Sequence, residues 1–339
     1  MCYFLKKTTK QNYVKQTILT FKQMKKIAFF LLLLLFFACQ KVATTWLPSE
    51  AKTAFRLNDL CFVNDSIGYV AGGAKFSDDI LLKTHDGGKT WDTCISALSG
   101  KSFYALLFRT PQQGLVAGTD GRLYSTEDGG KSWQVKQLDY WKTVYAFDYV
   151  NDTDIIAVGG DGYNTGIIWK YTATDRKWAL IDSPQFQLRD VDFVENGIGY
   201  ACGYATIIKS KDGGLTWEIT PAQNELFSAL CFLNEKVGYA VGRTGSIIKT
   251  TDGGDSWETL RSGNSPFHAA IRLNDVAFVS EKTGYVVGDE GVVMKTTDAG
   301  KIWKTLQQYG KTDFQAIHLW NENKGIIVGS EGTIVNFAE

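Results

Sequence analysis

Two repeated phrases predict an all-β fold, a seven-bladed propeller of four-stranded antiparallel blades. A phrase of the form Gly-Tyr-x-x-Gly recurs about every forty residues, and its seven copies, four of them exact, begin at Gly68, Gly114, Ile155, Gly199, Gly238, Gly284 and Gly325. A second phrase, Asp-Gly-Gly followed by Trp, recurs with the same period after four of these copies, and a fifth phrase has Ala299 in place of the first glycine. Self-similarity at such a spacing is typical of repeat architectures, in which each unit is one supersecondary element.

Each repeat reads as four short strands. In the first repeat these are LNDLCFV (57–63), GYVAG (68–72), ILLKT (80–84) and a strand that begins at Trp91. Alternating apolar residues bounded by glycine turns favour antiparallel hairpins. Four strands per repeat of this length predict a propeller blade.

The turn before each Trp explains the stretch HDGGKTW (His85–Trp91), whose Gly-Lys-Thr is also found in phosphate-binding loops. Such a loop needs a glycine at the position of Lys83, so the spacing excludes it. The aspartate is instead expected to accept hydrogen bonds from the following backbone N–H groups, with both glycines at positive φ. This is the Asp-box pattern, a structural device centred on Asp86, Asp128, Asp212, Asp252 and Asp298.

Two repeats deviate from the pattern. The third loses the turn glycines but keeps Trp178, so we expect its outer hairpin to survive with another turn. The seventh ends at Glu339 before any Trp strand, whereas Trp46 stands one period before Trp91. We therefore expect the N-terminal strand to complete the last blade and to close the ring, which would leave no open sheet edge.

Charge and cysteine usage exclude several classes of function. Lys+Arg and Asp+Glu are both 36, so the chain lacks the net positive charge of a non-specific nucleic-acid binder. There is no Cys-x-x-Cys, and the three histidines have no metal-ligand spacing. Cys61 and Cys231 share one register of different repeats and are interpreted as unpaired, buried residues. We expect a monomer with no cofactor and no metal.

The first residues predict export. From Met24 the chain reads MKKIAFFLLLLLFFACQK, a basic start, a short apolar run and then Ala38 and Cys39. This resembles a bacterial lipoprotein signal, with residues 24–38 as signal peptide, Cys39 as the lipidated residue and residues 39–45 as a tether. An ordinary signal peptide or a retained anchor is the alternative, because Phe36 and Phe37 are bulky for a lipobox. Residues 1–23 precede this second Met and are interpreted as an over-extended start.

The mouth of the pore is the best candidate for a binding surface. Aligning the first strands places one ring position at Asp59, Ala105, Ala146, Asp190, Ala229, Asp275 and Ala316. The residues just before them are Asn58, Tyr104, Tyr145, Arg189, Ser228, Asn274 and Gln315. Arg56 and Arg272 align slightly upstream, close to Arg189, and could bind carboxylates or carbonyls of a partner. The alternative is that the aspartates cap turns and the alanines fit a crowded axis.

Catalytic interpretations have less support. A sialidase needs three arginines, a Tyr-Glu pair and an acidic Asp, and this chain has neither an Arg-Ile-Pro segment nor the Tyr-Glu pair on a first strand. The neighbouring acids Asp78-Asp79 and Asp289-Glu290 could flank a glycosidic bond, although such loop acids are usually only solvated. No Gly-x-Ser-x-Gly elbow occurs.

The combination of Asp-boxes and Gly-Tyr-x-x-Gly strands over residues 46–339 resembles the photosystem II stability/assembly factor family of propellers. The resemblance implies a lipid-anchored or lumenal protein that binds a membrane-protein intermediate and performs no chemistry. We therefore expect a non-catalytic, membrane-tethered scaffold that recognises an envelope or membrane protein, with a glycan-active hydrolase of the sialidase type as the alternative. The expected contact residues are Arg56, Asn58, Asp59, Tyr104, Tyr145, Arg189, Asp190, Arg272, Asn274 and Asp275.

Overall fold

The computed structural model describes residues 44–49, 51, 53–96, 100–263, 270–306 and 309–338. The expected over-extended start, the signal peptide, Cys39 and the tether up to residue 43 lie outside the described residues. Residues Thr44–Glu339 form one compact unit. Its regular structure is β apart from four short 3-10 turns, Thr119–Gly121, Glu195–Gly197, Asp289–Gly291 and Ser330–Gly332.

Four of the repeats form separate four-stranded antiparallel sheets in chain order. Repeat 1 contains β2 (Leu57–Phe62), β3 (Gly68–Ala74), β4 (Asp78–Thr84) and β5 (Asp92–Ser96). Repeat 2 contains β6 (Phe103–Phe108), β7 (Gly114–Gly118), β8 (Arg122–Thr126) and β9 (Gln134–Gln137). Repeat 3 contains β10 (Val144–Tyr149), β11 (Ile155–Gly160), β12 (Gly166–Thr172) and β13 (Lys177–Asp182). Repeat 6 contains β20 (Leu273–Phe278), β21 (Gly284–Gly288), β22 (Val293–Thr296) and β23 (Lys304–Thr305).

Repeats 4 and 5 share one six-stranded sheet. Its strands are β14 (Leu188–Phe193), β15 (Gly199–Ser210), β16 (Glu218–Phe232), β17 (Gly238–Gly242), β18 (Ile247–Thr250) and β19 (Glu258–Arg261). The two repeats merge because β15 runs through the second and third strand positions of repeat 4, and β16 runs from its fourth position into the first position of repeat 5.

The last sheet contains both ends of the described chain. β24 (Phe314–Asn321), β25 (Lys324–Gly329) and β26 (Ile334–Ala338) are completed by β1 (Thr45–Ser49), which pairs antiparallel with β26. Trp46 lies opposite Phe337 and packs on its ring at 5.8 Å between ring centroids. The N-terminal strand is therefore the fourth strand of repeat 7, at the position that the sequence leaves empty.

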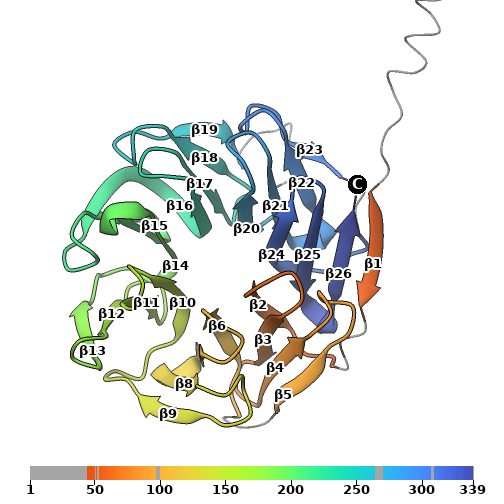
Figure 1. The fold of residues 1–339 in the computed structure, drawn as a ribbon. Coiled ribbons are helices and arrows are strands. Elements are labelled where there is room, and N and C mark those ends of the chain that lie inside the picture. Colours follow the sequence, from red (N-terminus) through yellow and green to blue (C-terminus); the bar gives the residue numbers. More distant parts are fainter. Residues whose placement is uncertain are drawn as a thin grey trace, which may run out of the picture. The chain divides into compact units, whose positions relative to one another are not determined.

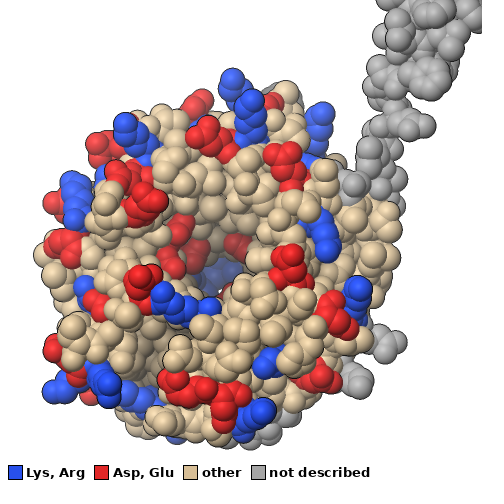
Figure 2. Space-filling model, in the orientation of Figure 1, with Lys and Arg blue, Asp and Glu red and all other residues tan. Residues whose placement is uncertain are grey.

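The first strand of each repeat lies nearest the centre of the molecule, and the later strands lie progressively outward (Figure 1). β2 contacts β6 on one side and β24 on the other, and the same neighbour relation continues through β10, β14, β16 and β20. Figure 2 shows that the molecular face is hollowed at this centre and that acidic and basic side chains reach the hollow. The residues of the first strands therefore decide what this channel offers to a ligand.

The five predicted aspartate turns form the expected hydrogen bonds. Asp86 Oδ1 accepts from the backbone N–H groups of Lys89 and Thr90 at 3.0 and 2.9 Å, and Oδ2 accepts from the Thr90 hydroxyl at 2.6 Å. The Thr90 hydroxyl is the main cause of the lowered pKa of Asp86, about 2. Gly87 and Gly88 have φ values of 72° and 82°. We call the turns at Asp86, Asp128, Asp212, Asp252 and Asp298 the Asp-Gly turns.

The Asp-Gly turn of one repeat packs on the repeat before it. At the junction of repeats 1 and 2, Lys83 Nζ donates to the carbonyl of Gly129 at 3.0 Å and lies 5.1 Å from the centroid of the Tyr69 ring. Tyr69 stacks on Phe108 at 3.5 Å and donates its hydroxyl to the Pro111 carbonyl at 2.9 Å. The same lysine-to-turn bond recurs from Lys170, Lys209 and Lys249. Burial and these bonds together hold adjacent sheets in register.

Cys61, Cys94, Cys202 and Cys231 are free. Cys61 and Cys231, which were expected to be buried, are only partly buried, whereas Cys202 is fully buried. Over the residues that the structure describes, no helix is long and apolar enough to cross a membrane. Over the same residues, no group of His, Cys, Asp and Glu is arranged to hold a metal ion.

Candidate functional site

The ring position inferred from the sequence is one level of the channel wall. Asp59, Asp190 and Asp275 pair across their ladders with Ala71, Cys202 and Val287, which occupy equivalent positions of the second strands. Each follows a register shift in the first strand. The shift turns two successive residues towards the channel, because a bulge places two residues opposite one.

The aspartates of this ring join neighbouring repeats. Asp59 Oδ1 accepts from its own neighbour, Leu60 N, at 2.8 Å, and Oδ2 accepts from Leu106 N of the next repeat at 2.8 Å. Asp190 bridges in the same way to Leu230 N at 2.9 Å, and Asp275 to Ile317 N at 2.8 Å. One level deeper, Asp148 and Asp192, which the sequence analysis missed, bond Phe193 N and Phe232 N at 2.5 and 2.6 Å.

These carboxyl groups lie where water is scarce. Burial raises the pKa of Asp59 to about 7, of Asp190 to about 6 and of Asp275 to about 8, and the backbone N–H bonds oppose the rise only in part. Burial also raises the pKa of Asp148 to about 7. Because both oxygens of Asp59, Asp190 and Asp275 are engaged, we assign these side chains to the joining of repeats.

The two ring asparagines also join repeats. Asn58 donates to the Phe103 carbonyl at 2.7 Å and to the Ser102 hydroxyl at 3.0 Å. Asn274 donates to the Phe314 carbonyl and to Asp289 Oδ1, both at 2.7 Å. The alternative of a structural role therefore accounts for the side-chain contacts of Asn58, Asn274 and the aspartates, and leaves the arginines and tyrosines of the predicted set.

Arginines gather at the mouth of the channel. Arg189 lies 4.2 Å from the centroid of the Tyr145 ring, which packs on Tyr104 at 5.3 Å. Arg56 donates to Gln315 Oε1. The pKa of Arg272 is lowered to about 10, mainly by burial, and the positive charges of Arg243, Arg189 and Arg56 contribute to this shift while Asp289 opposes it. The three predicted arginines are therefore near enough for their charges to interact.

Arg243 is a fourth member that the sequence analysis missed. It directly follows the Gly-Tyr-Ala-Val-Gly strand of repeat 5, so it lies at the end of a second strand and not at the start of a first strand. Within the described part of the chain, none of the four arginines forms an ion pair with a carboxylate. The buried Nε of Arg272 has no hydrogen-bond partner there. We call Arg56, Arg189, Arg243 and Arg272 the arginine cluster.

Exposed tyrosine side chains are linked to the arginine cluster. Tyr163 and Tyr204 pack on each other at 5.0 Å and are 57% and 38% exposed. Gln187 ties them to the cluster, because its backbone bonds Tyr163 and Tyr204 and its amide donates to the Tyr145 hydroxyl at 3.4 Å. Trp141, at the approach to β10, is 65% exposed. Arginine, tyrosine and tryptophan are the residue types that most often dominate protein interfaces.

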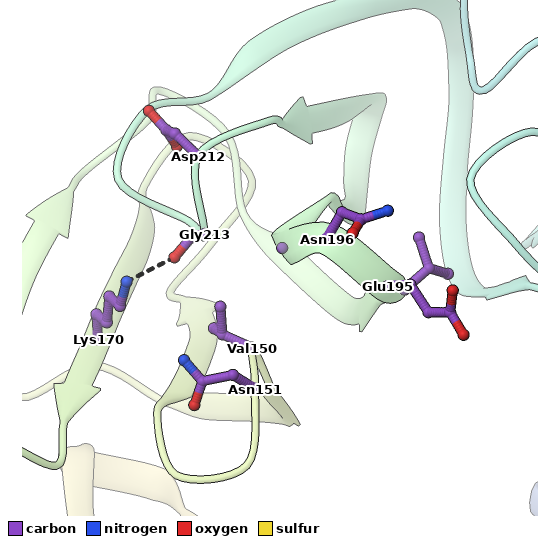
Figure 3. Close-up of a pocket in the computed structure, with 9 residues that line it drawn as sticks. Val150, Asn151, Lys170, Glu195, Asn196, Asp212 and Gly213 are labelled. Atoms are coloured by element: carbon purple, nitrogen blue, oxygen red, sulfur yellow. Dashed lines mark hydrogen bonds between the residues drawn. The ribbon is translucent and has the colours of Figure 1, made fainter.

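The places proposed for glycosidase chemistry are used within the fold. Asp79 is fully buried and accepts from Gly100 N at 2.9 Å, and Asp289 accepts from Asn274. A pocket of about 740 Å³ between repeats 3 and 4 contains Lys170 and Asp212. Figure 3 shows Lys170 pointing to the Gly213 carbonyl, to which it donates at 2.7 Å, and Asp212 holds its own turn. Lys170 and Asp212 therefore stabilise the junction between repeats 3 and 4.

Comparison with known proteins identifies a family of β-propellers that this chain resembles in sequence. The family described as photosynthesis system II assembly factor YCF48 matches three overlapping segments, residues 170–265, 221–311 and 271–338. A lipoprotein of that name from Synechococcus sp. (strain CC9902) is 26% identical over 225 residues, which cover 53% of this chain and 65% of the relative. The chain belongs to the photosystem II assembly factor-like family of β-propellers.

Other relatives show how far the likeness extends. The photosystem II assembly protein Ycf48 of Thermosynechococcus vestitus is 32% identical over 94 residues, 27% of this chain and 26% of that protein. The matches thus span less than two thirds of either curated relative. A structure described as YCF48 bound to D1 peptide has a TM-score of 0.70 at 18% identity and covers 89% of this chain and 97% of its own.

The fold extends beyond the family. YCF48 from Cyanidioschyzon merolae has a TM-score of 0.68 at 17% identity, covering 86% of this chain and 98% of its own. The WD40 β-propeller domain of Doa1 has a TM-score of 0.67 at 12% identity, with 87% and 97% covered. At these identities the structures establish a shared β-propeller architecture and nothing about ligands.

Proposed function

We propose that this protein is a non-catalytic binding scaffold that recognises a carboxylate-bearing segment of a protein partner through the arginine cluster and the tyrosines beside it. The observation that carries the proposal is that four arginines share one channel mouth without an ion-paired carboxylate among the described residues. Mutual repulsion at that mouth is relieved when a partner supplies negative charge.

The tyrosines extend this surface for a polypeptide. Tyr104, Tyr145 and Tyr163 all lie close enough to Arg189 to interact with its charge. Partly exposed aromatic rings beside unpaired guanidinium groups provide both apolar contact area and charge-assisted hydrogen bonds. Since a member of the family has been described in complex with D1 peptide, a peptide segment of a membrane protein is the partner class that we favour.

The number of blades, the closure of the ring and the cellular location are part of the same proposal. We count the repeats as seven blades, with β1 closing the ring, which is supported by the β1–β26 pairing and the neighbour relation between β24 and β2. A closed ring presents many loops on a rigid face. We place the protein at a membrane of the cell envelope through a lipid on Cys39, which lies outside the described residues.

The test is affinity capture of the tagged, full-length protein from its own cells after mild crosslinking. A triple variant, Arg56→Ala, Arg189→Ala and Arg272→Ala, is run beside a control that loses the same charge elsewhere, Lys89→Ala, Lys131→Ala and Lys301→Ala. We expect one envelope protein to be enriched at least about tenfold by the native form and the control, and lost with the arginine variant. Equal recovery by the two variants would refute the assignment of the arginine cluster.

A further inference from the structure

The junction between repeats 2 and 3 lacks the tyrosine, the lysine and the Asp-Gly turn that meet at the junctions of repeats 1 and 2, 4 and 5, and 5 and 6. On the ladder of repeat 1, Tyr69 pairs with Lys83, and on repeat 5 Tyr239 pairs with Lys249. On repeat 2 the same step pairs Leu115 with Ser125. Neither the tyrosine hydroxyl nor the lysine amine is therefore available to hold a turn of repeat 3.

The turn itself is also missing. Trp178 follows Lys170 by the same number of residues as Trp217 follows Lys209, so the two segments align without a gap. Ala173 then occupies the place of the turn aspartate Asp212, and Tyr171 the place of Ser210. β12 and β13 continue towards each other instead, with Tyr171 opposite Trp178 and Arg176 at a φ of 51°. The predicted survival of this hairpin is confirmed, and it leaves the junction unfilled.

Leu115, Ser125 and Ala173 thus replace the tyrosine, the lysine and the turn aspartate. An open groove of about 710 Å³ lies at this junction. Its lining includes the rings of Tyr149, Tyr171 and Trp178 from repeat 3 and Leu115 and Val135 from repeat 2. Tyr171 and Trp178 pack together at 5.5 Å between ring centroids, and Val135 is 57% exposed. The groove thus combines an aromatic floor with an apolar wall that water covers in the free protein.

The rim of the groove carries unpaired positive charge. Of its two acids, Asp152 pairs with Arg109 at 2.9 Å, whereas Glu127 accepts from the neutral amide of Gln113 at 2.8 Å and keeps its charge, so the lining has one net positive charge. Lys136 and Arg176 are exposed and form no ion pair within the described ranges. An occupant that brings a carboxylate is therefore favoured over one that brings an amine.

The other junctions indicate the shape of the occupant. Where the lysine and the Asp-Gly turn are present, a turn of the next repeat occupies the equivalent place, as Gly213 does against Val150 and Lys170 beside the pocket of about 740 Å³. We propose that the groove between repeats 2 and 3 is a second docking site, which takes a turn of a partner protein carrying a large apolar side chain next to a carboxylate. The apolar side chain packs on Tyr149, Tyr171 and Trp178, and the carboxylate lies between Lys136 and Arg176.

This site is separate from the arginine cluster. The cluster lies where first strands begin, whereas the groove lies where the third strand turns into the fourth, at the opposite ends of antiparallel strands. The protein would then contact partners through two faces, one at the channel mouth and one at an unfilled junction. Such an arrangement goes beyond the proposed function, since neither site needs the other to bind.

The test uses a capped pentapeptide, Gly-Glu-Phe-Asp-Gly, titrated calorimetrically into the full-length protein in mild detergent. The protein carries the Arg56→Ala, Arg189→Ala and Arg272→Ala changes, so that the mouth does not compete. Comparison ligands are the same peptide with Lys at both acidic positions and a soluble chitin trisaccharide. We expect the acidic peptide to bind at least about tenfold more tightly than the lysine peptide.

Two groove variants locate that binding. Lys136→Glu with Arg176→Glu, both at exposed positions, is expected to weaken the acidic peptide at least about tenfold without changing the melting temperature. A second variant rebuilds the missing lysine and Asp-Gly turn with Ser125→Lys, Tyr171→Thr, Ala173→Asp, Thr174→Gly and Asp175→Gly. This filled variant is expected to abolish binding of the acidic peptide and to raise the melting temperature.

Three outcomes overturn the proposal. These are equal binding of the acidic and lysine peptides, peptide binding that survives in both groove variants, and binding of the trisaccharide alone, which would make the groove a glycan site. Because every protein in this titration lacks three mouth arginines, these outcomes leave the proposed function untouched.

Discussion

The junctions of repeat 2 with its two neighbours have the same backbone and opposite side-chain chemistry. Between repeats 1 and 2, Tyr69, Lys83 and the turn at Asp128 interlock, and Asp59 adds a bond to Leu106 N. Between repeats 2 and 3, Leu115, Ser125 and Ala173 stand at the equivalent places, and the ring residue is Ala105. Strand pairing therefore builds each sheet, apolar packing places the sheets side by side, and a few polar side chains decide whether a junction is filled or open.

The largest effect is expected at the junction that joins the two ends of the chain. Deleting residues 42–50 removes β1, exposes the edge of β26 and removes the Ser49 bond to the Gly88 carbonyl. The melting temperature should fall by more than about 10 °C, because a strand, Trp46 and a turn contact are lost together. Scanning calorimetry measures this, with Leu47→Ser at an exposed position as control. An unchanged melt would rule out the closure by β1.

Substitution of a turn glycine compares a filled junction with the open one. Gly214 has a φ of 82°, and a Cβ there would lie 2.7 Å from Ile156 Cδ1. Gly214→Ala should lower the free energy of unfolding by about 1–3 kcal/mol, because of strain and overpacking. The aligned residue at the open junction is the exposed Asp175, where Asp175→Ala should be neutral within about 0.5 kcal/mol. Equal effects in urea titrations would contradict the comparison.

The aspartate bridges make stability depend on pH. Burial raises the pKa values of Asp59, Asp190 and Asp275 to about 7, 6 and 8, so their contribution is fully present below the unfolded pKa near 4. It is lost as the pH rises through about 6 to 8, where the folded protein must ionise buried groups. The free energy of unfolding should therefore fall by at least about 1 kcal/mol between pH 5 and pH 8.

The variant Asp275→Asn checks the origin of that slope. The amide cannot ionise, so the slope between pH 5 and pH 8 should become shallower, although the variant is less stable at pH 5 because one N–H loses its acceptor. Chemical denaturation at several pH values measures both effects. A slope equal to that of the native protein would show that other groups titrate.

The smallest effect concerns one hydroxyl. Tyr69→Phe removes the bond to the Pro111 carbonyl and should lower the free energy of unfolding by about 1 kcal/mol. Tyr171→Phe, at the open junction, should leave it unchanged within about 0.5 kcal/mol, because no hydrogen bond of the Tyr171 hydroxyl is found among the described residues. If Tyr171→Phe lowered the free energy of unfolding as much as Tyr69→Phe, the Tyr171 hydroxyl would have a hydrogen-bond partner within the protein, and the groove would not be open.

Much of the fold was readable because it repeats. Turn glycines, the aspartates before them and alternating strands are local features, so the Asp-Gly turns and the surviving hairpin of repeat 3 followed from sequence alone. The merging of repeats 4 and 5 did not, since Ala205 and Gln223 gave no local sign that the strands would continue through those positions. A structural role of Asp59 was one of two alternatives, but its bond to the next repeat was not predicted, because the partner Leu106 lies in another repeat.

The sequence by itself determined the repeat, the strand order within most repeats, the aspartate turns and the shared position of the ring residues on the first strands. Each of these depends on residues a few positions apart, and backbone geometry then dictates the outcome. Only the tertiary structure decided that Arg243 joins three arginines from other repeats, that the ring aspartates bridge strands, and that one junction is open. Those properties depend on side chains brought together from distant repeats, where distance and burial cannot be read from spacing.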